Sequence, residues 1–391
     1  SKLSKPTCNF VFKHVSVEIM YKTILQLKNS NCLDVYGISS YILKYSASFI
    51  CEPLTHIFNC CLDTAIFPAA LKFSKVIPIF KKGNNLECTN YRPISIIPTV
   101  SKVFEILLKN QITAYFEHNY LFSNRQFGFR AKHSTINAVI SLVKHCLDEL
   151  ENGKLVHNRF YDLTRAFDTV PHDVLIQKLS FYGFNDISKN LMKSYLNHRY
   201  QSVLYNNSMS KYMLNKYGVP QGSVLWPLLF IIYVNDLPVN ILDDTSQAYM
   251  YADDLALTVY SKNQHIFLRK LSDISSTITE WCNANRLKLN HNKTVDLKIT
   301  TKSGDFFLNT PVNFLGIYME SSLGWNTHIE YLANKLSKSL FIIRILKQYL
   351  NVQALLSVYY AHFYSHLELW NYFVGQPYFS VQIACYPEEV C

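Results

Sequence analysis

Apolar positions recur along the chain with two spacings, and the change from one to the other marks the expected elements. Apolar residues three and four positions apart predict helices, whereas short apolar or alternating runs predict strands. Helices are expected over residues 17–27, 41–47, 54–65, 101–117, 135–150, 172–182, 187–196, 222–235, 264–287 and 326–366. Strands are expected over residues 75–80, 94–97, 155–163, 294–300 and 312–318, as a hairpin over 200–216, and as two short strands within 248–259.

The order of these elements favours one fold class. Helices and strands alternate irregularly, without an internal repeat or a flexible linker, and this order is typical of an α+β domain built on an antiparallel sheet. Ser101 is the expected N-cap of the helix over 101–117, with Glu105 in its first turn. Because 391 residues are too many for one typical domain, two or three subdomains that share a core are expected.

Composition argues against two broad classes of protein. Hydrophobic residues make up 49% of the chain, which excludes general disorder. The longest apolar run, Val224–Val234, is 11 residues long and contains Pro227, whereas a bilayer span needs about 20 residues. No membrane segment is therefore expected. No secretory signal precedes Cys8 and the chain begins at Ser1, so it is interpreted as a fragment of a longer protein.

Charge and cysteine usage narrow the range of partners. A net charge of +10 favours nucleic acid or an anionic membrane, and the aromatic residues, 14% of the chain, can stack on bases or fill a core. The 10 cysteines form no C-x2-C pair and no combined Cys/His pattern, so no zinc site is expected. Scattered thiols are typical of a reducing compartment, which predicts a location in the nucleus or the cytoplasm.

Two acidic segments stand beside apolar strands, F-Y-D-L-T-R-A-F-D at 160–168 and Y-A-D-D-L at 251–255. An ionised carboxylate in such a place is costly unless it meets a cation. Two neighbouring strands would bring Asp162 together with Asp253 and Asp254, and a pair of Mg²⁺ ions would relieve the repulsion between the three carboxylates. By contrast, the Asp-Asp pair at 243–244 lies in the polar stretch I-L-D-D-T-S-Q and is predicted to form a solvated loop.

These segments resemble motifs of the reverse transcriptases. D-L-T-R-A-F-D is similar to the first palm motif, G-V-P-Q-G-S-V-L (218–225) to the second and Y-A-D-D to the third, in the family's order. Over roughly residues 25–365 the chain resembles the enzyme of LINE-class (non-LTR) retrotransposons of the jockey-like kind. Further matching segments are N-Y-R-P-I-S (90–95), S-K-V-F-E (101–105), Q-F-G-F-R-A-K-H-S-T (126–135), S-Y-L-N-H-R-Y-Q-S-V (194–203), Y-V-N-D-L-P (233–238), L-K-L-N-H-N-K-T (287–294), N-F-L-G-I (313–317) and L-G-W-N-T-H-I (323–329).

The resemblance implies a right-hand polymerase, with fingers, a palm that contains an antiparallel sheet, and a partial helical thumb. The expected ranges are an N-terminal helical extension over 1–70, fingers over 71–155, palm over 156–305, and thumb or connection over 306–391. After about Leu367 the family pattern is lost. The implied partners are an RNA template, a DNA primer and dNTPs; the oligomeric state is left open.

The resemblance also implies the roles of the acidic residues and their neighbours. Asp162 and Asp253 would hold two Mg²⁺ ions, with Mn²⁺ as an alternative, and Asp254 would support them. Phe167 falls where the family places a bulky ring under the incoming sugar, so a 2′-hydroxyl would be excluded and deoxynucleotides selected. Lys293 resembles the lysine of the fourth palm motif, which is suggested to protonate the departing pyrophosphate.

Other residues acquire binding roles from the resemblance. Gln221 and Gly222 fall in the segment that packs against the template and the nascent pair, where glycine allows close approach of the backbone. Lys82 and Arg92 match the finger cations that clamp the triphosphate. Two further cations are assigned as phosphate contacts, Arg130 and Arg199.

The expected reaction is RNA-directed DNA synthesis, in which a primer 3′-hydroxyl attacks the α-phosphate of a dNTP. One departure from the family favours an alternative: Trp226 stands where the family has glycine, which predicts backbone strain or overpacking and a catalytically inactive, nucleic-acid-binding remnant. An intron-type maturase is opposed by the segment Y-V-N-D-L-P, and an RNA-dependent RNA polymerase is opposed by Phe167.

Overall fold

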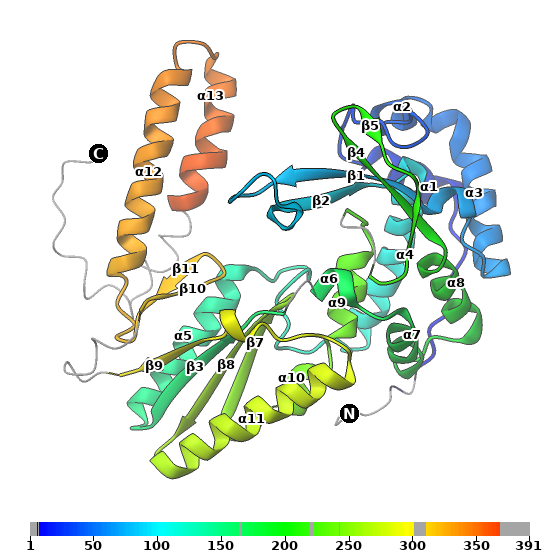
Figure 1. Ribbon diagram of the computed structural model, residues 1–391. Coiled ribbons are helices and arrows are strands. Elements are labelled where there is room, and N and C mark those ends of the chain that lie inside the picture. Colours follow the sequence, from blue (N-terminus) through cyan, green and yellow to red (C-terminus); the bar gives the residue numbers. More distant parts are fainter. Residues whose placement is uncertain are drawn as a thin grey trace. The chain divides into compact units, whose positions relative to one another are not determined.

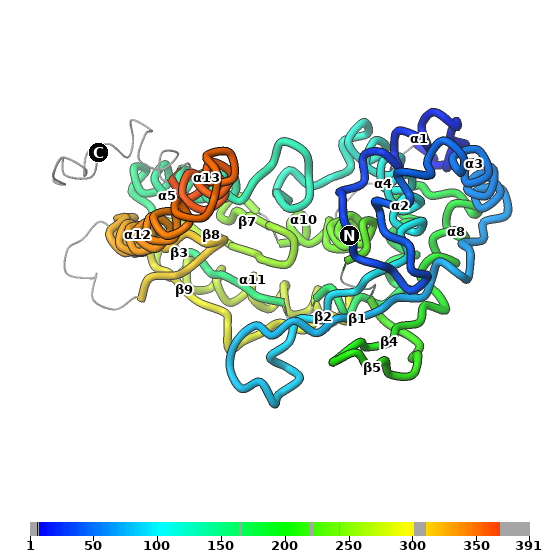
Figure 2. Tube along the Cα trace, turned by 90° about the horizontal axis from the view of Figure 1, so that it is seen from above, coloured from blue at the N-terminus to red at the C-terminus, as the bar shows by residue number. Residues whose placement is uncertain are grey.

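The computed structural model describes residues 6, 8–163, 166–218, 222–241, 243–300 and 310–367. Its contacts divide the chain into two compact units, and each is built from segments that are distant in sequence. Unit 1 comprises Ser1–Phe129, Asp162–Leu242 and Ile274–Asn290; unit 2 comprises Arg130–Tyr161, Asp243–Asp273 and His291–Cys391. Figure 1 labels most elements of both units, and Figure 2 follows the course of the chain through them.

Unit 1 is mainly helical around one apolar helix. In α9 (Trp226–Tyr233) every residue except Pro227 is buried, so the helix is apolar on all sides, which is typical of a helix in the centre of a core. The other helices of this unit are α1 (Val17–Leu25), α2 (Ser40–Tyr45), α3 (Ala47–Thr64), α4 (Thr99–His118), α6 (Ala166–Thr169), α7 (His172–Phe181), α8 (Asp186–Leu196) and α10 (Leu237–Ile241), with short 3-10 turns at Ala69–Lys72 and Cys88–Asn90.

Unit 1 also contains a sheet, drawn in blue and green in Figure 1. Its strands are β1 (Phe73–Phe80), β2 (Tyr91–Ile96), β4 (Arg199–Tyr205), β5 (Ser208–Met209) and β6 (Met213–Asn215). The order is β2-β1-β4-β5, and β6 also pairs with β4. β1 and β2 form an antiparallel hairpin in which Ile79 pairs with Arg92. β1 and β4 run parallel, with Val76 opposite Val203.

Unit 2 is built on a four-stranded antiparallel sheet in the order β7-β8-β3-β9. The strands are β3 (Leu155–Tyr161), β7 (Ser246–Tyr251), β8 (Asp254–Ser261) and β9 (Val295–Ile299). Six consecutive residues of β8 are buried, as expected for a central strand that is covered on both faces. Helix α5 (Thr135–Glu151), capped by Ser134, packs on β3, β7 and β8.

The remaining elements of unit 2 follow the sheet in sequence. The first half of α11 (Gln264–Ala284) belongs to this unit and its second half to unit 1; Phe267 on the first half makes an edge contact with His157 of β3. A 3-10 turn covers His291–Lys293. Then come the hairpin β10 (Val312–Phe314) and β11 (Ile317–Met319), the helices α12 (Asn326–Leu346) and α13 (Val352–Tyr359), and a π-helical turn over Tyr360–Tyr364.

Most expected elements are confirmed, and several bounds are corrected. The helix expected over 54–65 begins at Ala47, the helix expected over 326–366 is interrupted after Leu346, and the strand expected over 312–318 is the hairpin β10–β11. The antiparallel sheet and the helices over 135–150, 172–182 and 187–196 are present within one or two residues of the predicted bounds. Helix α4, however, begins at Thr99 with Pro98 as its N-cap, so Ser101 is not a cap. Ser101 is instead fully buried, and its hydroxyl donates to the Glu105 carboxylate at 3.4 Å.

Among the helices of the described residues, none combines the length and the apolar character that crossing a bilayer requires.

Candidate active site

The hairpin between β7 and β8 positions two carboxylates. Tyr251 pairs with Asp254 across the hairpin, so that Ala252 and Asp253 form its turn. Ala252 adopts a left-handed conformation with φ of 58°, which turns the chain within these two residues. Asp253 therefore stands in the turn and Asp254 begins β8, and both side chains are half-buried.

The register of the neighbouring strand relates this hairpin to the first acidic segment. β3 pairs with β8 so that Tyr161, its last residue, lies opposite Leu255. Asp162 follows Tyr161 directly, and Asp254 precedes Leu255 directly. The two strand ends that carry the predicted carboxylates are therefore adjacent in the sheet.

A polar contact that sequence reasoning missed orients Asp162. The side-chain amide of Asn290 donates to its Oδ2 at 3.3 Å, and the backbone N–H of Asn290 donates to its carbonyl at 2.9 Å. An antiparallel bridge between Leu163 and Leu289 extends this pairing. Asn290 belongs to the segment L-K-L-N-H-N-K-T, so the signal was present, but nothing in the sequence showed that this segment runs beside Asp162.

The three aspartates offer carboxylate oxygens alone, and oxygen ligands are what Mg²⁺ prefers. Within the described residues, no group of three or more His, Cys, Asp or Glu side chains is arranged to hold a metal ion. The expected absence of a zinc site stays a prediction.

The predicted ring beneath the sugar is held by aromatic packing within unit 1. Phe167 lies in α6 and is half-buried, with its ring stacked on Phe230 of α9 at a centroid distance of 4.3 Å. Phe129 meets the same ring edge-on at 6.2 Å. Gly218 packs tightly against Phe167, because a Cβ at that position would lie 2.6 Å from the Phe167 carbonyl oxygen. The start of the second palm motif is thus pressed against the first.

Gly222 has a structural requirement for glycine. Its φ is +128°, and a Cβ there would lie 2.3 Å from the carbonyl oxygen of Ser95 in β2. A side chain would therefore be strained and would also collide with the finger hairpin. Gly222 therefore lies close to the chain's own β2, while its packing against the template and the nascent pair stays a prediction. Gln221, predicted to share its role, lies outside the described residues.

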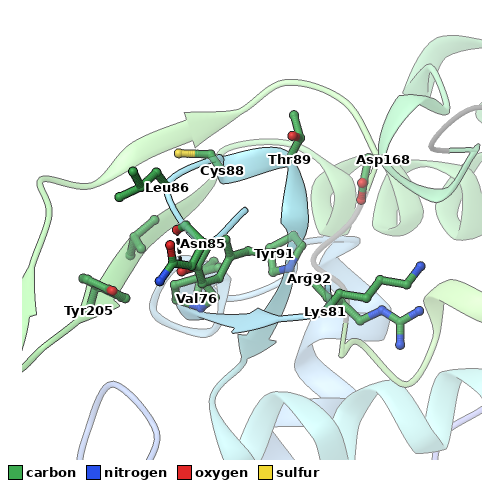
Figure 3. A pocket seen from close by; sticks show the side chains of 13 residues that line it. Val76, Lys81, Asn85, Leu86, Cys88, Thr89, Tyr91, Arg92, Asp168 and Tyr205 are labelled. Carbon is green, nitrogen blue, oxygen red and sulfur yellow. Dashed lines mark hydrogen bonds between the residues drawn. The ribbon is translucent and has the colours of Figure 1, made fainter. Parts of the chain in front are cut away.

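A pocket of about 920 Å³ lies against the finger hairpin. Arg92 and Lys81 both line it, and Figure 3 shows their side chains extending to the same side of the hairpin. Asp168, next to Phe167, also lines the pocket. The remaining lining residues are Val76, Pro78, Asn85, Leu86, Cys88, Thr89, Tyr91, Pro93, Val203 and Tyr205.

Some residues that line the pocket were not predicted from the sequence, and some predicted residues do not line it. Lys81 and Asp168 line it and were not predicted; Lys82 is exposed at the end of the hairpin and is not among the lining residues. In unit 2, Lys293 is exposed in the 3-10 turn after Asn290, and Arg130 is half-buried at the start of that unit.

Arg199 corrects the prediction of a phosphate contact. Its side chain is buried, with a relative exposure of 1%, its Nη1 donates to the Tyr195 carbonyl at 3.2 Å, and its guanidinium lies over the Tyr195 ring. A cation that is enclosed in this way does not reach a nucleic-acid phosphate. The sequence could not show this, because the first residue of β4 resembles an exposed cation until its neighbours are known.

Trp226 departs from expectation in one respect. It is the first residue of α9 and is not among the described residues with positive φ, so no left-handed conformation calls for glycine here. The indole is buried, and within the described residues its Nε1 has no hydrogen-bond partner. Burial of an unsatisfied donor therefore has a cost here, whereas the predicted backbone strain is absent.

A family model described as reverse transcriptase (RNA-dependent DNA polymerase) matches residues 79–319, which is more than half of the chain. The chain belongs to the reverse transcriptase family. This membership confirms the α+β, right-hand polymerase fold class that the motifs implied.

The relatives of this reverse transcriptase include several of insect elements. The probable RNA-directed DNA polymerase from transposon BS of Drosophila melanogaster is 32% identical over 344 residues, which are 81% of this chain and 37% of that protein. The RNA-directed DNA polymerase from mobile element jockey of the same fly is 28% identical over 292 residues, 71% of this chain and 32% of that protein. The chain thus spans about a third of the length of these curated relatives, and the jockey-like, non-LTR resemblance is confirmed.

One solved structure is more distantly similar. An apo telomerase from Candida tropicalis, truncated from its C-terminal domain, aligns over 66% of this chain and 55% of that chain, with 14% identity and a TM-score of 0.45. This similarity is too weak to add to the family assignment.

Proposed function

We propose that this chain is the RNA-directed DNA polymerase of a non-LTR retrotransposon and adds dNTPs to a primer 3′-hydroxyl on an RNA template. The observation that carries the proposal is the pairing of Tyr161 with Leu255. It supports the convergence of Asp162, one residue beyond β3, with Asp254 at the start of β8 and Asp253 in the turn. Once converged, carboxylates at the ends of adjacent strands would require cations.

Asp162 and Asp253 would hold two Mg²⁺ ions, with Asp254 supporting them, and Mn²⁺ is an alternative. When bound, such a pair activates the primer hydroxyl and stabilises charge on the leaving pyrophosphate. Asn290 contributes by fixing the Asp162 carboxylate through its side-chain amide. The preference for Mg²⁺ rests on the oxygen-only donor set.

Residues of unit 1 would bind the incoming nucleotide. Arg92, assisted by Lys81 in the same pocket and by Lys82 at the end of the hairpin, would hold the triphosphate through charge-assisted hydrogen bonds. The ring of Phe167 would lie under the sugar and exclude a 2′-hydroxyl. Gln221 and Gly222 would pack against the template and the nascent pair.

Two cations of unit 2 complete the proposed assignment. Lys293, exposed after Asn290, would supply the proton to the departing pyrophosphate. Arg130 would contact a nucleic-acid phosphate. The functional division into extension (1–70), fingers (71–155), palm (156–305) and thumb (306–391), and a location in the nucleus or cytoplasm, belong to the same proposal.

Primer extension tests this function. The purified chain is supplied with poly(rA), oligo(dT), dTTP and Mg²⁺, and we expect extension of the primer. Asp253→Asn and Asp162→Asn should lower the rate by a factor on the order of a thousand, because each removes a charged carboxylate that would hold the metal ions. Asp244→Asn is the matched control, since Asp244 is exposed in the turn before β7, as the sequence predicted.

A second candidate function, an inactive nucleic-acid-binding remnant, is favoured by one observation. The indole of Trp226 is buried with an unsatisfied Nε1 four residues after Gly222. An inactive remnant should bind template–primer without extending it, and Trp226→Gly should then create or raise primer extension. An active parent that Trp226→Gly does not improve contradicts the remnant.

A further inference from the structure

Glu105 is a fully buried carboxylate in α4, the helix that follows the finger hairpin. Its Oε2 accepts hydrogen bonds from the Ser223 hydroxyl at 2.7 Å and from the backbone N–H groups of Val224 at 2.7 Å and Leu225 at 3.3 Å. These residues form the end of the second palm motif and the entry to α9. A single oxygen of the finger helix thus holds three donors that lie more than 100 residues away in sequence.

The hydroxyl of Ser223 extends this contact. It donates to Glu105, and it accepts from the backbone N–H of Trp226 at 3.2 Å and from the Tyr195 hydroxyl at 2.9 Å. Burial raises the pKa of Tyr195, so its hydroxyl keeps the proton that it donates. All hydrogen-bonding capacity of Ser223 is therefore used, and its orientation is fixed.

The same segment is held at its other end by a close backbone contact. Gly222 lies against the Ser95 carbonyl so closely that no Cβ fits. Ser95 belongs to β2, the strand that carries Arg92. A segment pressed on β2 at Gly222 and bonded to α4 at Ser223–Leu225 has little freedom to shift.

We propose that Glu105 is a positioning residue for polymerisation, which holds the loop Gly222–Leu225 of the second palm motif in register with the finger hairpin. This inference rests on the proposed function, because that loop is where the template and the nascent pair are proposed to pack. Glu105 touches no substrate and acts only through the loop. Loss of its carboxylate frees the backbone of Val224 and Leu225 and displaces Gly222 from β2.

Asp34 provides a matched control in the same unit. It is also buried, and it accepts three backbone N–H bonds, from Tyr36 at 2.9 Å, Ile38 at 3.0 Å and Thr99 at 2.7 Å. It therefore fixes the start of α4 with the same chemistry that Glu105 uses on the loop. Its variants lose a similar set of bonds but leave the loop untouched.

The experiment compares Glu105→Ala, Glu105→Gln and Asp34→Ala with the parent. Steady-state primer extension gives kcat and the KM for dTTP, thermal melting gives stability, and amide hydrogen exchange is followed in the peptide covering residues 223–226. We expect Glu105→Ala to lower kcat/KM about tenfold to a hundredfold, mainly through KM, and to speed exchange in that peptide. Glu105→Gln should stay near the parent, since an amide oxygen can replace Oε2 and its NH₂ can donate to Ser101.

Three outcomes decide the proposal. Asp34→Ala should lower the melting temperature as Glu105→Ala does, without the rise in KM; an equal rise in KM for both variants overturns the positioning role and leaves only stability. Unchanged exchange over 223–226 in Glu105→Ala also overturns it. If the folded parent extends no primer, the proposed function fails, and the exchange measurement alone then decides whether Glu105 holds the loop.

Discussion

The ring of Phe167 stacks on the ring of Phe230, with centroids 4.3 Å apart and an interplanar angle of 29°. Phe230 is fully buried in α9, whereas Phe167 is half-buried. A rigid base beneath a partly open ring restricts the movement of that ring, which is what a steric filter needs. The stack therefore supports a selective role for Phe167 as well as a packing role.

Shortening Phe167 should weaken the choice of sugar. Phe167→Val removes the ring under the proposed sugar position, so the ratio of dTTP to UTP incorporation should fall on the order of tenfold to a hundredfold. Single-nucleotide addition with each substrate measures it. Phe129→Leu is the control, because it removes the edge-on neighbour and keeps Phe167. If the ratio of dTTP to UTP incorporation is unchanged in Phe167→Val, Phe167 has only a packing role.

The buried donor of Trp226 makes a prediction about stability. Trp226→Phe removes the unsatisfied Nε1, a gain of about 1–3 kcal/mol that offsets the smaller ring, so the Tm should stay level or rise. Trp226→Ala leaves a cavity and should cost about 3–5 kcal/mol. Thermal and urea unfolding measure both. If Trp226→Phe destabilises the chain as much as Trp226→Ala, the indole N–H contributes to the stability of the fold and is not an unsatisfied donor.

The acid stability of unit 2 should depend on His328. Burial lowers the pKa of this residue from 6.5 to about 4, and its Nδ1 accepts from the Tyr318 N–H. Between these pH values the unfolded chain binds a proton that the folded chain does not, so stability falls as pH drops from 6.5 towards 4, by up to about 3 kcal/mol.

The measurement is urea unfolding of the chain across that pH range. His328→Gln should flatten this part of the stability profile, while the exposed His14→Gln should leave it as in the parent. A profile that His328→Gln does not change contradicts the assignment.

Template–primer binding should be strongly salt-dependent. The chain carries a net charge of +10, and contacts to phosphates release counterions, so affinity should fall at least about tenfold between ~50 and ~200 mM salt. Fluorescence anisotropy of a labelled RNA–DNA hybrid measures this. An affinity that barely changes contradicts a basic binding surface.

Local patterns in the sequence predicted the elements and the acidic segments. The strands that carry Asp162 and Asp253 were recognisable because each is a short apolar run with a carboxylate at its end. The Arg199 and Ser101 predictions were wrong for the same reason: burial of each depends on residues that are far away in sequence. The parallel pairing of β1 with β4 and the bonds from Glu105 to the 223–225 segment are also long-range, so periodicity and motif spacing could not reveal them.

We propose that Asp162 and Asp253 hold metal ions together, and counting the Mn²⁺ ions bound to the chain by electron paramagnetic resonance is the sharpest test of that joint site. The sample is the chain with template–primer ended by a dideoxynucleotide and the next dNTP. We predict two bound Mn²⁺ ions in the parent and loss of at least one in Asp162→Asn and in Asp253→Asn, with Asp244→Asn like the parent. Equal Mn²⁺ binding in all four proteins would mean that Asp162 and Asp253 do not hold the ions.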